Sequence, residues 1–342
     1  MQKNRSIVIN APGEVAIVES PMPQRTNGEV LLKLLYGGIC GSDLGSYRGT
    51  FAYVNYPRIP GHEFSAEIVE CDEENAYGLK PGMIVTGNPY FNCGHCYSCR
   101  RNLVNACTDN QTLGCQRDGA FSTYFAFPEE RVYDGKGLPP KTLAAIEPFC
   151  IGYHGVKRAK LKSGARVLII GAGSIGIVTA ISAKLFGAEV TICDIAPKKL
   201  EMAKTFGVDH ILLNDSPENF AAGVESLTNG DGFDAAFEAV GLPNTFMNCI
   251  DAVCFGGTVV DIGVGKKSLD FFYTIIQKKE LNIYGSRNAL KEDFLELIDL
   301  CASGKVDIEK IVTDVYPFDD ATKAFADFSK NADKMLKVML QF

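Results

Sequence analysis

The chain contains 342 residues, of which 46% are hydrophobic and 22% are charged, and its formal net charge is −7. This length suits two domains, and the composition is that of a globular protein. The negative charge argues against a nucleic-acid partner, and we expect no membrane association because no apolar run reaches the roughly 20 residues of a membrane span. The N-terminal sequence MQKNRSIVIN lacks the apolar segment of a secretion signal, which predicts a cytoplasmic protein.

Residues 1–150 are expected to form a β-rich domain. Short apolar runs separated by Gly and Pro turns predict strands at 30–35, 65–69 and 83–86. Long helical periodicity is absent from the sequence until about residue 143.

From residue 166 the pattern changes to apolar β runs that alternate with helical segments such as 174–186 and 197–206. The predicted strands cover 166–170, 190–194, 210–213, 233–238, 258–262 and 281–285. Six strands joined by crossover helices predict a doubly wound parallel sheet. The remaining pattern predicts helices at 292–302 and 321–329 and a last strand at 335–342. The chain therefore divides into a β-rich domain (1–150), an inserted α/β domain (151–287) and a segment that returns to the first domain (288–342).

The first strand of the α/β domain leads into Gly171-x-Gly173-x-x-Gly176 and then into a predicted helix. In this context the glycines permit a tight turn, close approach of a pyrophosphate and close packing of the helix on the strand. Asp194 ends the next strand, about 20 residues later, where a carboxylate binds ribose hydroxyls and repels a 2′-phosphate. The pattern predicts a dinucleotide site and favours NAD over NADP, and a glycine-rich turn that binds nothing is the alternative.

Five further residues are expected to contact the cofactor. Lys199, in the helix after Asp194, is expected either to contact the ribose or to be an ordinary solvated lysine. The other expected contacts are Ser174 and Ile175 in the glycine turn, Val264 after the fifth strand, and Arg287 after the sixth.

Four of the 12 cysteines follow the spacing Cys93-x2-Cys96-x2-Cys99-x7-Cys107. Reducing conditions disfavour disulfides in the cytosol, so clustered thiols predict a metal site. Four thiolates surround one tetrahedral Zn²⁺ and leave no open position, which predicts a structural zinc that pins a loop lacking a core of its own. An iron–sulfur cluster, a nucleic-acid-binding zinc ribbon and unrelated thiols are the alternatives.

Further potential ligands are dispersed before the α/β domain. They are Cys40 in GGICGSD, His62 and Glu63 in PGHEF, and Glu147 in IEPF. Together they offer sulfur, nitrogen and oxygen donors, and a catalytic zinc needs three protein ligands and one open position. Spacing alone does not show that these residues converge, and each of them alone also has an ordinary structural explanation.

These motifs, in this order, resemble the zinc-dependent medium-chain dehydrogenases/reductases, the alcohol/polyol dehydrogenase family. The resemblance rests on Cys40-Gly-Ser-Asp43, Gly61-His62-Glu63, the four-cysteine segment, Glu147-Pro148 and the GAGSIG turn, and it spans essentially the whole chain. Glutamate before proline is similar to the sorbitol and threonine dehydrogenase branch. The runs FAYVNYPRIPGHE and Gly285-Ser286-Arg287-Asn288-Ala289 resemble bacterial galactonate and gulonate oxidoreductases. The resemblance implies a GroES-like catalytic domain with a structural-zinc lobe at about 88–110, and an α/β Rossmann domain with a six-stranded parallel sheet.

The same resemblance implies two zinc ions per chain. Cys40 and His62 would hold the catalytic ion together with a glutamate, Glu63 or Glu147, and the four clustered cysteines would hold the structural ion. Asp43 would orient His62, although a capping role in the turn after Cys40 is the alternative.

Ser42 resembles the hydroxyl that passes the released proton outward in this family, although an ordinary turn serine bonded to its own backbone is a serious competitor. Related enzymes often carry a histidine five residues after the first cysteine, and this chain has Gly45 there. The outer part of the proton route therefore stays open between Tyr47 and a chain of water molecules.

The implied function is NAD-dependent oxidation of a secondary alcohol on a small polar substrate. Hexonates such as L-galactonate or L-gulonate are favoured, and sorbitol-like polyols or L-threonine are the alternatives. Arg287 and Asn288 are candidate substrate contacts because a guanidinium binds a carboxylate or adjacent hydroxyls through its fork of donors; an interdomain salt bridge is the alternative. A zinc-free reductase and a non-catalytic member of the superfamily are less favoured because the metal set is complete. Similar bacterial enzymes are usually homotetramers or homodimers, which is the expectation for this chain.

Overall fold

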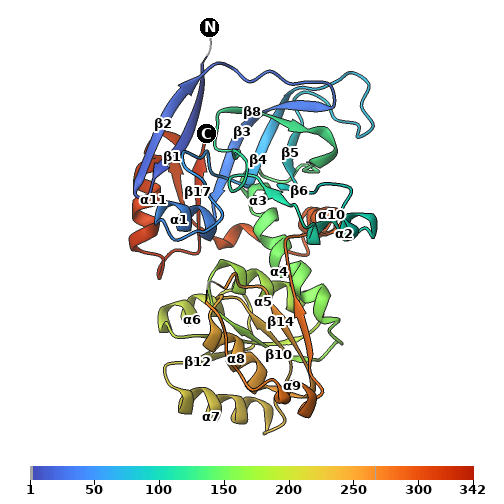
Figure 1. Cartoon of the computed structure of the whole chain (residues 1–342), viewed down its shortest axis with the longest axis vertical. Helices are drawn as coiled ribbons and strands as arrows, with labels where there is room; N and C mark the ends of the chain where they lie inside the picture. The colour runs from blue at the N-terminus through green and yellow to red at the C-terminus, as the bar shows by residue number, and fades with distance from the viewer. Residues whose placement is uncertain (1–2, 266) are drawn as a thin grey trace. The chain divides into compact units, whose positions relative to one another are not determined.

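The computed structural model describes residues 3–265 and 267–342 and divides the chain into two compact units (Figure 1). The first unit combines Met1–Pro148 with Ala289–Phe342, and the second is Phe149–Asn288. Among the described residues, no helix is both long enough and apolar enough to span a bilayer.

The first unit is built on a seven-stranded sheet whose main path runs β16-β17-β3-β4-β5-β9, with β8 also paired to β3. The bounds of these strands are β3 Glu29–Ile39, β4 Glu63–Glu70, β5 Ile84–Gly87, β8 Tyr124–Pro128, β9 Val132–Asp134, β16 Val312–Pro317 and β17 Lys337–Gln341. Smaller two-stranded sheets are formed by β1 Asn4–Ala11 with β2 Glu14–Ser20, and by β6 Tyr90–Phe91 with β7 Gln111–Thr112. The helices of this unit are α1 Gly41–Tyr47, α2 Tyr97–Arg100, α3 Pro140–Ala144, the start of α4 Ile146–Ala159, α10 Lys291–Ala302 and α11 Ala321–Lys330.

The C-terminal strand closes this sheet beside β3. β17 pairs antiparallel with β3, with Val338 opposite Ile39 and Met339 opposite Gly38. On its other edge, β3 pairs with β4, which sets Gly38 opposite Glu63. Chain segments that are far apart in sequence therefore lie side by side at the end of β3.

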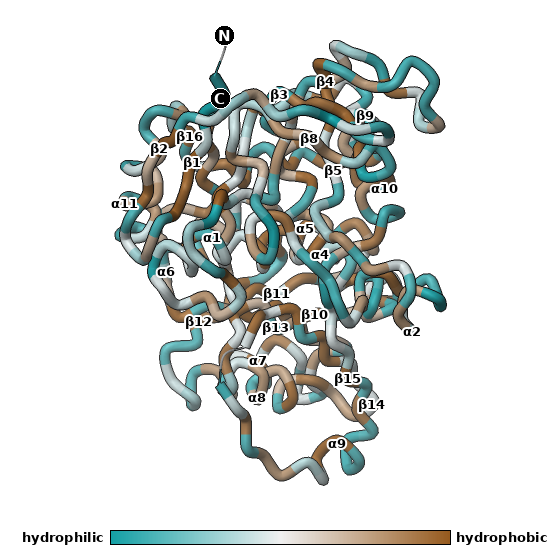
Figure 2. The backbone as a smooth tube through the Cα atoms, turned by 45° about the horizontal axis from the view of Figure 1, so that its top comes forward, coloured by the Kyte–Doolittle hydropathy of each residue, from teal (hydrophilic) through white to brown (hydrophobic). Residues whose placement is uncertain are grey.

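The second unit contains six parallel strands in the order β12-β11-β10-β13-β14-β15. Their bounds are β10 Arg166–Ile170, β11 Glu189–Asp194, β12 His210–Leu213, β13 Phe233–Glu238, β14 Val253–Asp261 and β15 Asn282–Gly285. The helices are the remainder of α4, α5 Ser174–Leu185, α6 Pro197–Lys204, α7 Pro217–Thr228, α8 Pro243–Ala252 and α9 Thr274–Lys278. This strand order confirms the predicted doubly wound Rossmann sheet. β10, β11 and β13 are mostly hydrophobic along their length, as buried parallel strands require (Figure 2).

Several elements differ from the sequence prediction. The strand expected at 258–262 begins earlier, at Val253, and the final strand begins at Lys337 rather than at residue 335. The β1–β2 hairpin, the short helix α1 and the strand β16 were not anticipated. β2 and β16 have only part-buried and exposed residues, so neither carries the apolar run that identifies a buried strand.

Lys279 closes the C-terminal end of α8. Its Nζ donates hydrogen bonds to the carbonyl oxygens of Ile250 (2.9 Å), Asp251 (3.0 Å) and Val253 (2.7 Å). Carbonyl groups at a helix end have no partner within the helix and carry partial negative charge, so an ammonium group is favoured there.

We expect Lys279→Met to lower the free energy of unfolding by about 2 kcal/mol, because it removes charged hydrogen bonds from these carbonyls. Urea unfolding followed by circular dichroism measures the change. Lys278→Met, at the exposed neighbouring position, is the matched control and should shift stability by less than about 0.5 kcal/mol. Equal effects of the two variants would contradict a capping role for Lys279.

Candidate functional site

The first unit brings three predicted metal ligands together at the end of β3. Cys40 follows the last residue of β3, and His62 and Glu63 lie at the start of β4. The Cys40 sulfur, a ring nitrogen of His62 and a carboxylate oxygen of Glu63 all lie within 4.8 Å of one another. The pairing of β3 with β4 therefore produces a sulfur, nitrogen and oxygen donor set from two separate motifs.

The donor set depends on a glycine in β3. A Cβ at position 38 would lie 2.1 Å from Oε2 of Glu63, closer than any real contact allows. Glycine at this position leaves the space into which the Glu63 side chain folds.

Glu63 also forms a buried ion pair that the sequence did not reveal. Lys337 Nζ donates to Oε1 (2.6 Å) and Oε2 (2.7 Å) of Glu63, and both side chains are almost completely buried. Lys337 is the first residue of β17, so its partner lies 274 positions away in the chain. The sequence did contain one indication of this ion pair, namely a single lysine among the apolar residues of the last strand. A fully buried ammonium group needs a paired charge, so such a lysine indicates an acidic partner.

His62 lies in a strongly negative environment. Its Nδ1 is 3.9 Å from Oδ1 of Asp43 and makes no hydrogen bond within the described structure. Burial alone would lower the pKa of His62, but the charges of Cys40 and Asp43 outweigh it and raise that pKa well above its ordinary value. The site therefore favours a positive charge next to these groups, which a bound metal ion supplies in place of the proton.

Asp43 makes the capping contacts and also faces His62. Its carboxylate accepts hydrogen bonds from the backbone N–H groups of Cys40 (3.0 Å) and Gly61 (3.3 Å), and the side chain is 1% exposed. Burial raises the pKa of Asp43. Both interpretations of Asp43 therefore correspond to contacts in the structure, and the carboxylate ties together the two segments that carry Cys40 and His62.

Glu147 is the third buried carboxyl group of this site, after Glu63 and Asp43. It lies in the first turn of α4, and its Oε1 accepts a hydrogen bond from the hydroxyl of Tyr90. Burial, together with the charge of Glu63, raises the pKa of Glu147 to about 7. Glu147 is outside the close group formed by Cys40, His62 and Glu63. Tyr90 was not a candidate in the sequence because nothing local connects it to Glu147.

The contacts of Ser42 and Tyr47 bear on which residue carries the released proton outward. The Ser42 hydroxyl lies near the buried thiol of Cys115 and partly offsets the rise that burial causes in the pKa of that thiol, while the Ser42 carbonyl accepts from Ser46 Oγ (3.0 Å). The ring of Tyr47, a candidate for the outer part of the route, packs against Phe325 with a centroid distance of 5.7 Å and lies against the core of the unit. Packing in the core argues against Tyr47 as the next proton carrier.

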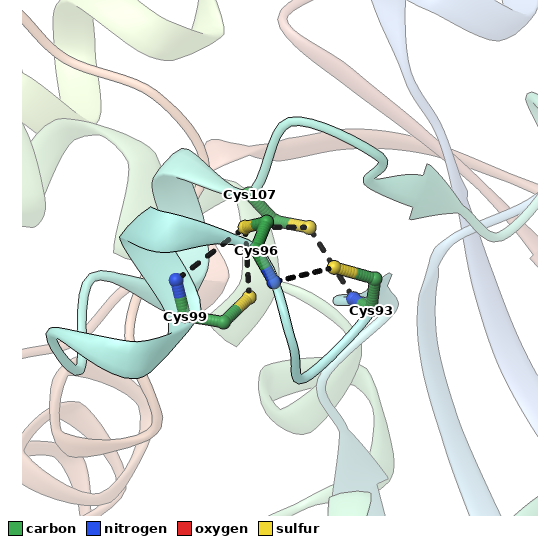
Figure 3. A group of neighbouring side chains, drawn as sticks. All are labelled: Cys93, Cys96, Cys99 and Cys107. Atoms are coloured by element: carbon green, nitrogen blue, oxygen red, sulfur yellow. Dashed lines mark hydrogen bonds between the residues drawn. The ribbon is translucent and has the colours of Figure 1, made fainter.

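The four clustered cysteines converge as predicted from their spacing (Figure 3). Cys96 Sγ lies 3.4 Å from Cys99 Sγ and 3.9 Å from Cys107 Sγ, near the separation of about 3.8 Å that a tetrahedron with Zn–S bonds of about 2.3 Å requires. Backbone N–H groups of Thr108 and Cys99 lower the pKa of Cys96 to about 5, which favours the thiolate that binds metal. His95 is exposed, and its Nδ1 bonds to the Cys93 carbonyl rather than joining this group.

In the second unit, the glycine turn has the geometry expected of a dinucleotide site. Gly171 adopts a φ of +107°, and a Cβ at Gly176 would lie 1.7 Å from the Gly171 carbonyl oxygen. A Cβ at Gly173 would meet nothing within 4 Å, which leaves open space over the turn. Ser174 and Ile175 begin α5, so their N–H groups belong to the free helix end that binds phosphate.

Asp194 organises the glycine turn as well as ending β11. Its Oδ2 accepts from the N–H of Ala172 (2.7 Å), and its Oδ1 accepts from the N–H of Ala196 (2.9 Å). The carboxylate therefore holds the loops after β10 and β11 together. Lys199 lies part-buried in α6.

The other predicted cofactor and substrate residues also belong to the second unit. Val264 follows β14 and is 64% exposed, and Arg287 is exposed just after β15. Asn288 adopts a left-handed conformation, and its buried Nδ2 has no hydrogen-bond partner in the described structure.

Comparison with known proteins identifies the family. The model for the alcohol dehydrogenase GroES-like domain matches residues 26–137, and the model for zinc-binding dehydrogenases matches residues 174–303. The chain is 33% identical to L-galactonate-5-dehydrogenase of Escherichia coli K12 over 98% of each chain.

The chain belongs to the zinc-type medium-chain alcohol/polyol dehydrogenase family. It is also 32% identical to sorbitol dehydrogenase of Bacillus subtilis, over 99% of this chain and 97% of that one. The crystal structure of an E. coli CFT073 alcohol dehydrogenase (rspB) complexed with NADH superposes with a TM-score of 0.90 and 29% identity over 99% of each chain. The resemblance inferred from the motifs is confirmed, and the protein is a zinc-dependent alcohol dehydrogenase that uses a nicotinamide cofactor.

We expect Lys337→Met to reduce the free energy of unfolding by about 3–5 kcal/mol, because it leaves the Glu63 carboxylate buried without its partner. Adding Glu63→Gln removes that charge, so the double variant should recover most of the loss. Urea unfolding at neutral pH measures all three proteins.

Lys334→Met removes an exposed lysine from the turn before β17 and should change stability by less than about 0.5 kcal/mol. If the double variant were no more stable than Lys337→Met alone, the buried ion pair would not account for the effect.

Proposed function

We propose that this enzyme oxidises a secondary alcohol of a sugar acid or polyol to the ketone with NAD as hydride acceptor, and that hexonates such as L-galactonate or L-gulonate are its preferred substrates. The observation that carries the proposal is the convergence of Cys40, His62 and Glu63, with Glu147 in the same unit. A relative at 33% identity is named L-galactonate-5-dehydrogenase. Sorbitol-like polyols are the second candidate, because a relative at 32% identity is named sorbitol dehydrogenase; L-threonine is the third.

Residues of the first unit are proposed to bind the metal, neutralise buried charge and transfer the proton. A zinc ion held by Cys40, His62 and a glutamate supplies Lewis-acid chemistry that makes the substrate hydroxyl more acidic. Lys337 neutralises Glu63, and Tyr90 holds Glu147 in place through its hydroxyl. The Ser42 Oγ accepts the proton from the substrate oxygen and passes it outward, and Asp43 holds the backbone around Cys40.

NAD is favoured over NADP because Asp194 places a carboxylate at the carboxyl end of β11, where it repels a 2′-phosphate. The glycine turn, Val264 and Arg287 are the proposed cofactor contacts. Arg287 and Asn288 are also the proposed substrate contacts, and the unpaired Nδ2 of Asn288 offers a donor for a substrate oxygen. A second zinc ion in the four-cysteine lobe, a cytoplasmic location and a homotetrameric or homodimeric state complete the proposal.

A screen of hexonates, pentitols, hexitols and L-threonine with NAD and NADP tests the substrate assignment. We expect the highest kcat/KM with a hexonate and NAD, and a preference for NAD over NADP of at least about tenfold, since one repelled phosphate is worth roughly 1.4 kcal/mol or more. Highest kcat/KM with sorbitol or threonine would move the assignment to the second or third candidate. Turnover of none of them would overturn it.

Two cysteine variants separate the proposed metal sites. Cys40→Ser should lose one of two zinc ions and its activity, with little change in melting temperature. Cys107→Ser should lose the other zinc ion and melt at a lower temperature, because the lobe depends on that metal for its fold. Elemental analysis and thermal melting are the readouts, and retention of both zinc ions by either variant would contradict the assigned ligands.

A further inference from the structure

Two carboxyl groups of the second unit face each other at the carboxyl edge of the sheet. Glu238 is the last residue of β13 and Asp261 is the last residue of β14, and the two are direct partners across these neighbouring parallel strands. Glu238 is 1% exposed, and Asp261 is part-buried. Neither has a role in the function proposed above.

The hydrogen bonds around Glu238 indicate which of the two carboxyl groups is ionised and which carries a proton. Glu238 accepts from the N–H groups of Val240 (3.0 Å) and Gly241 (2.9 Å) and from Thr245 Oγ1 (2.6 Å). A carboxyl group with so many donors is the ionised member, since a carboxylate only accepts. Asp261 hydrogen-bonds to Glu238 as well and must therefore bring the shared proton. Burial, with the charge of Glu238 adding to it, raises the pKa of Asp261 to about 6.

The loops after β13 and β14 contact each other beside this pair. A Cβ at Gly263 would lie 2.2 Å from Oε2 of Glu238, and a Cβ at Gly241 would lie 2.7 Å from the carbonyl oxygen of Val264. The N–H of Gly263 also donates to the Glu238 carbonyl (3.0 Å). The pair lines a cavity on one side, and on the other side Glu238 is in close contact with Gly263. A displacement of the Glu238 carboxylate toward Gly263 therefore displaces the loop that carries Val264.

We propose that Glu238 and Asp261 are positioning residues for the nicotinamide cofactor, and that one proton shared between their carboxyl groups holds the Val264 loop in its binding position. The proposal rests on the proposed function, in which Val264 is a cofactor contact. It adds a second group of positioning residues at the ends of β13 and β14, next to β10 and its glycine turn on the same edge of the sheet.

The pH dependence follows from the shared proton. Below pH about 6 the pair is held by its hydrogen bond, and above it both groups are ionised and repel each other. Because the folded-state pKa of Asp261 is raised, its contribution to stability is present at acidic pH and is lost as the pH rises through about 6. Cys249 on α8 also faces this pair, and burial raises its pKa well above its ordinary value, so the thiol stays neutral over that range. Lys267 of the loop after β14 lines the same cavity as the pair.

The test measures NAD affinity of the zinc-loaded enzyme by calorimetry at pH 5.5 and pH 7.5. We expect the Kd of the wild type for NAD to rise about fivefold between these values, a typical size for coupling between two sites. ADP-ribose, which lacks the nicotinamide ring, should bind with a similar Kd at both. In Asp261→Asn the amide donates to Glu238 at every pH, so its Kd for NAD should be the same at both.

A second measurement does not depend on cofactor binding. The melting temperature of the wild type should fall as the pH rises through about 6, and that of Asp261→Asn should fall less. Asp251→Asn removes the same charge from an exposed position of α8 and should behave as the wild type in both assays.

The outcomes separate the two proposals. If NAD binds but Asp261→Asn keeps the wild-type pH dependence, or if ADP-ribose shows the same dependence as NAD, the positioning role is wrong and the proposed function stands. If neither NAD nor ADP-ribose binds at any pH, the proposed function and this inference both fail.

Discussion

The buried contact between Lys337 and Glu63 joins β17, the last strand of the first unit, to β4 at the candidate metal site. Removing a single charge from water costs several kcal/mol, so neither side chain is stable in this place without the other. Lys337 reaches Glu63 only when β17 pairs with β3, and Glu63 has room only because residue 38 is glycine. The donor set of Cys40, His62 and Glu63 is therefore complete only in the fully assembled sheet.

The two cysteine-containing sites of this unit would hold a metal for different physical reasons. In the four-cysteine lobe, the neighbouring backbone N–H groups stabilise the thiolates, so local chain geometry is sufficient. Around Cys40 the carboxyl groups of Asp43, Glu63 and Glu147 are buried, and Lys337 and His62 are the basic side chains that lie among them. A cation there is favoured by the collected charge of distant segments, and an open coordination position can be left for a substrate.

In the second unit, carboxylates organise the ends of the parallel strands. Asp194 accepts from N–H groups of two loops, those after β10 and β11, and Glu238 accepts from two N–H groups of the single loop after β13. Loops at this edge have backbone donors without strand partners, so a carboxylate that satisfies several of them keeps the loops in one conformation. The loops that would meet a dinucleotide are thus ordered by side chains of the strands beneath them.

Much of this architecture could be read from local patterns. The six parallel strands were predictable because strands buried on both faces are continuous apolar runs, and the glycine turn and the four-cysteine segment are each contained in a short stretch of chain. The strands β2 and β16 were not predicted because their residues are part-buried or exposed, without such a run. The roles of Lys337, Tyr90 and Asp261 were not predicted from the sequence for another reason. Each acts through a partner on another strand or helix, and no spacing rule connects residues that only the tertiary fold brings together. Residue types and their order were thus enough to indicate the family and its metal chemistry, whereas the pairing of distant strands determined which charges are neutralised, which carboxylate lies in the donor group and which proton is shared.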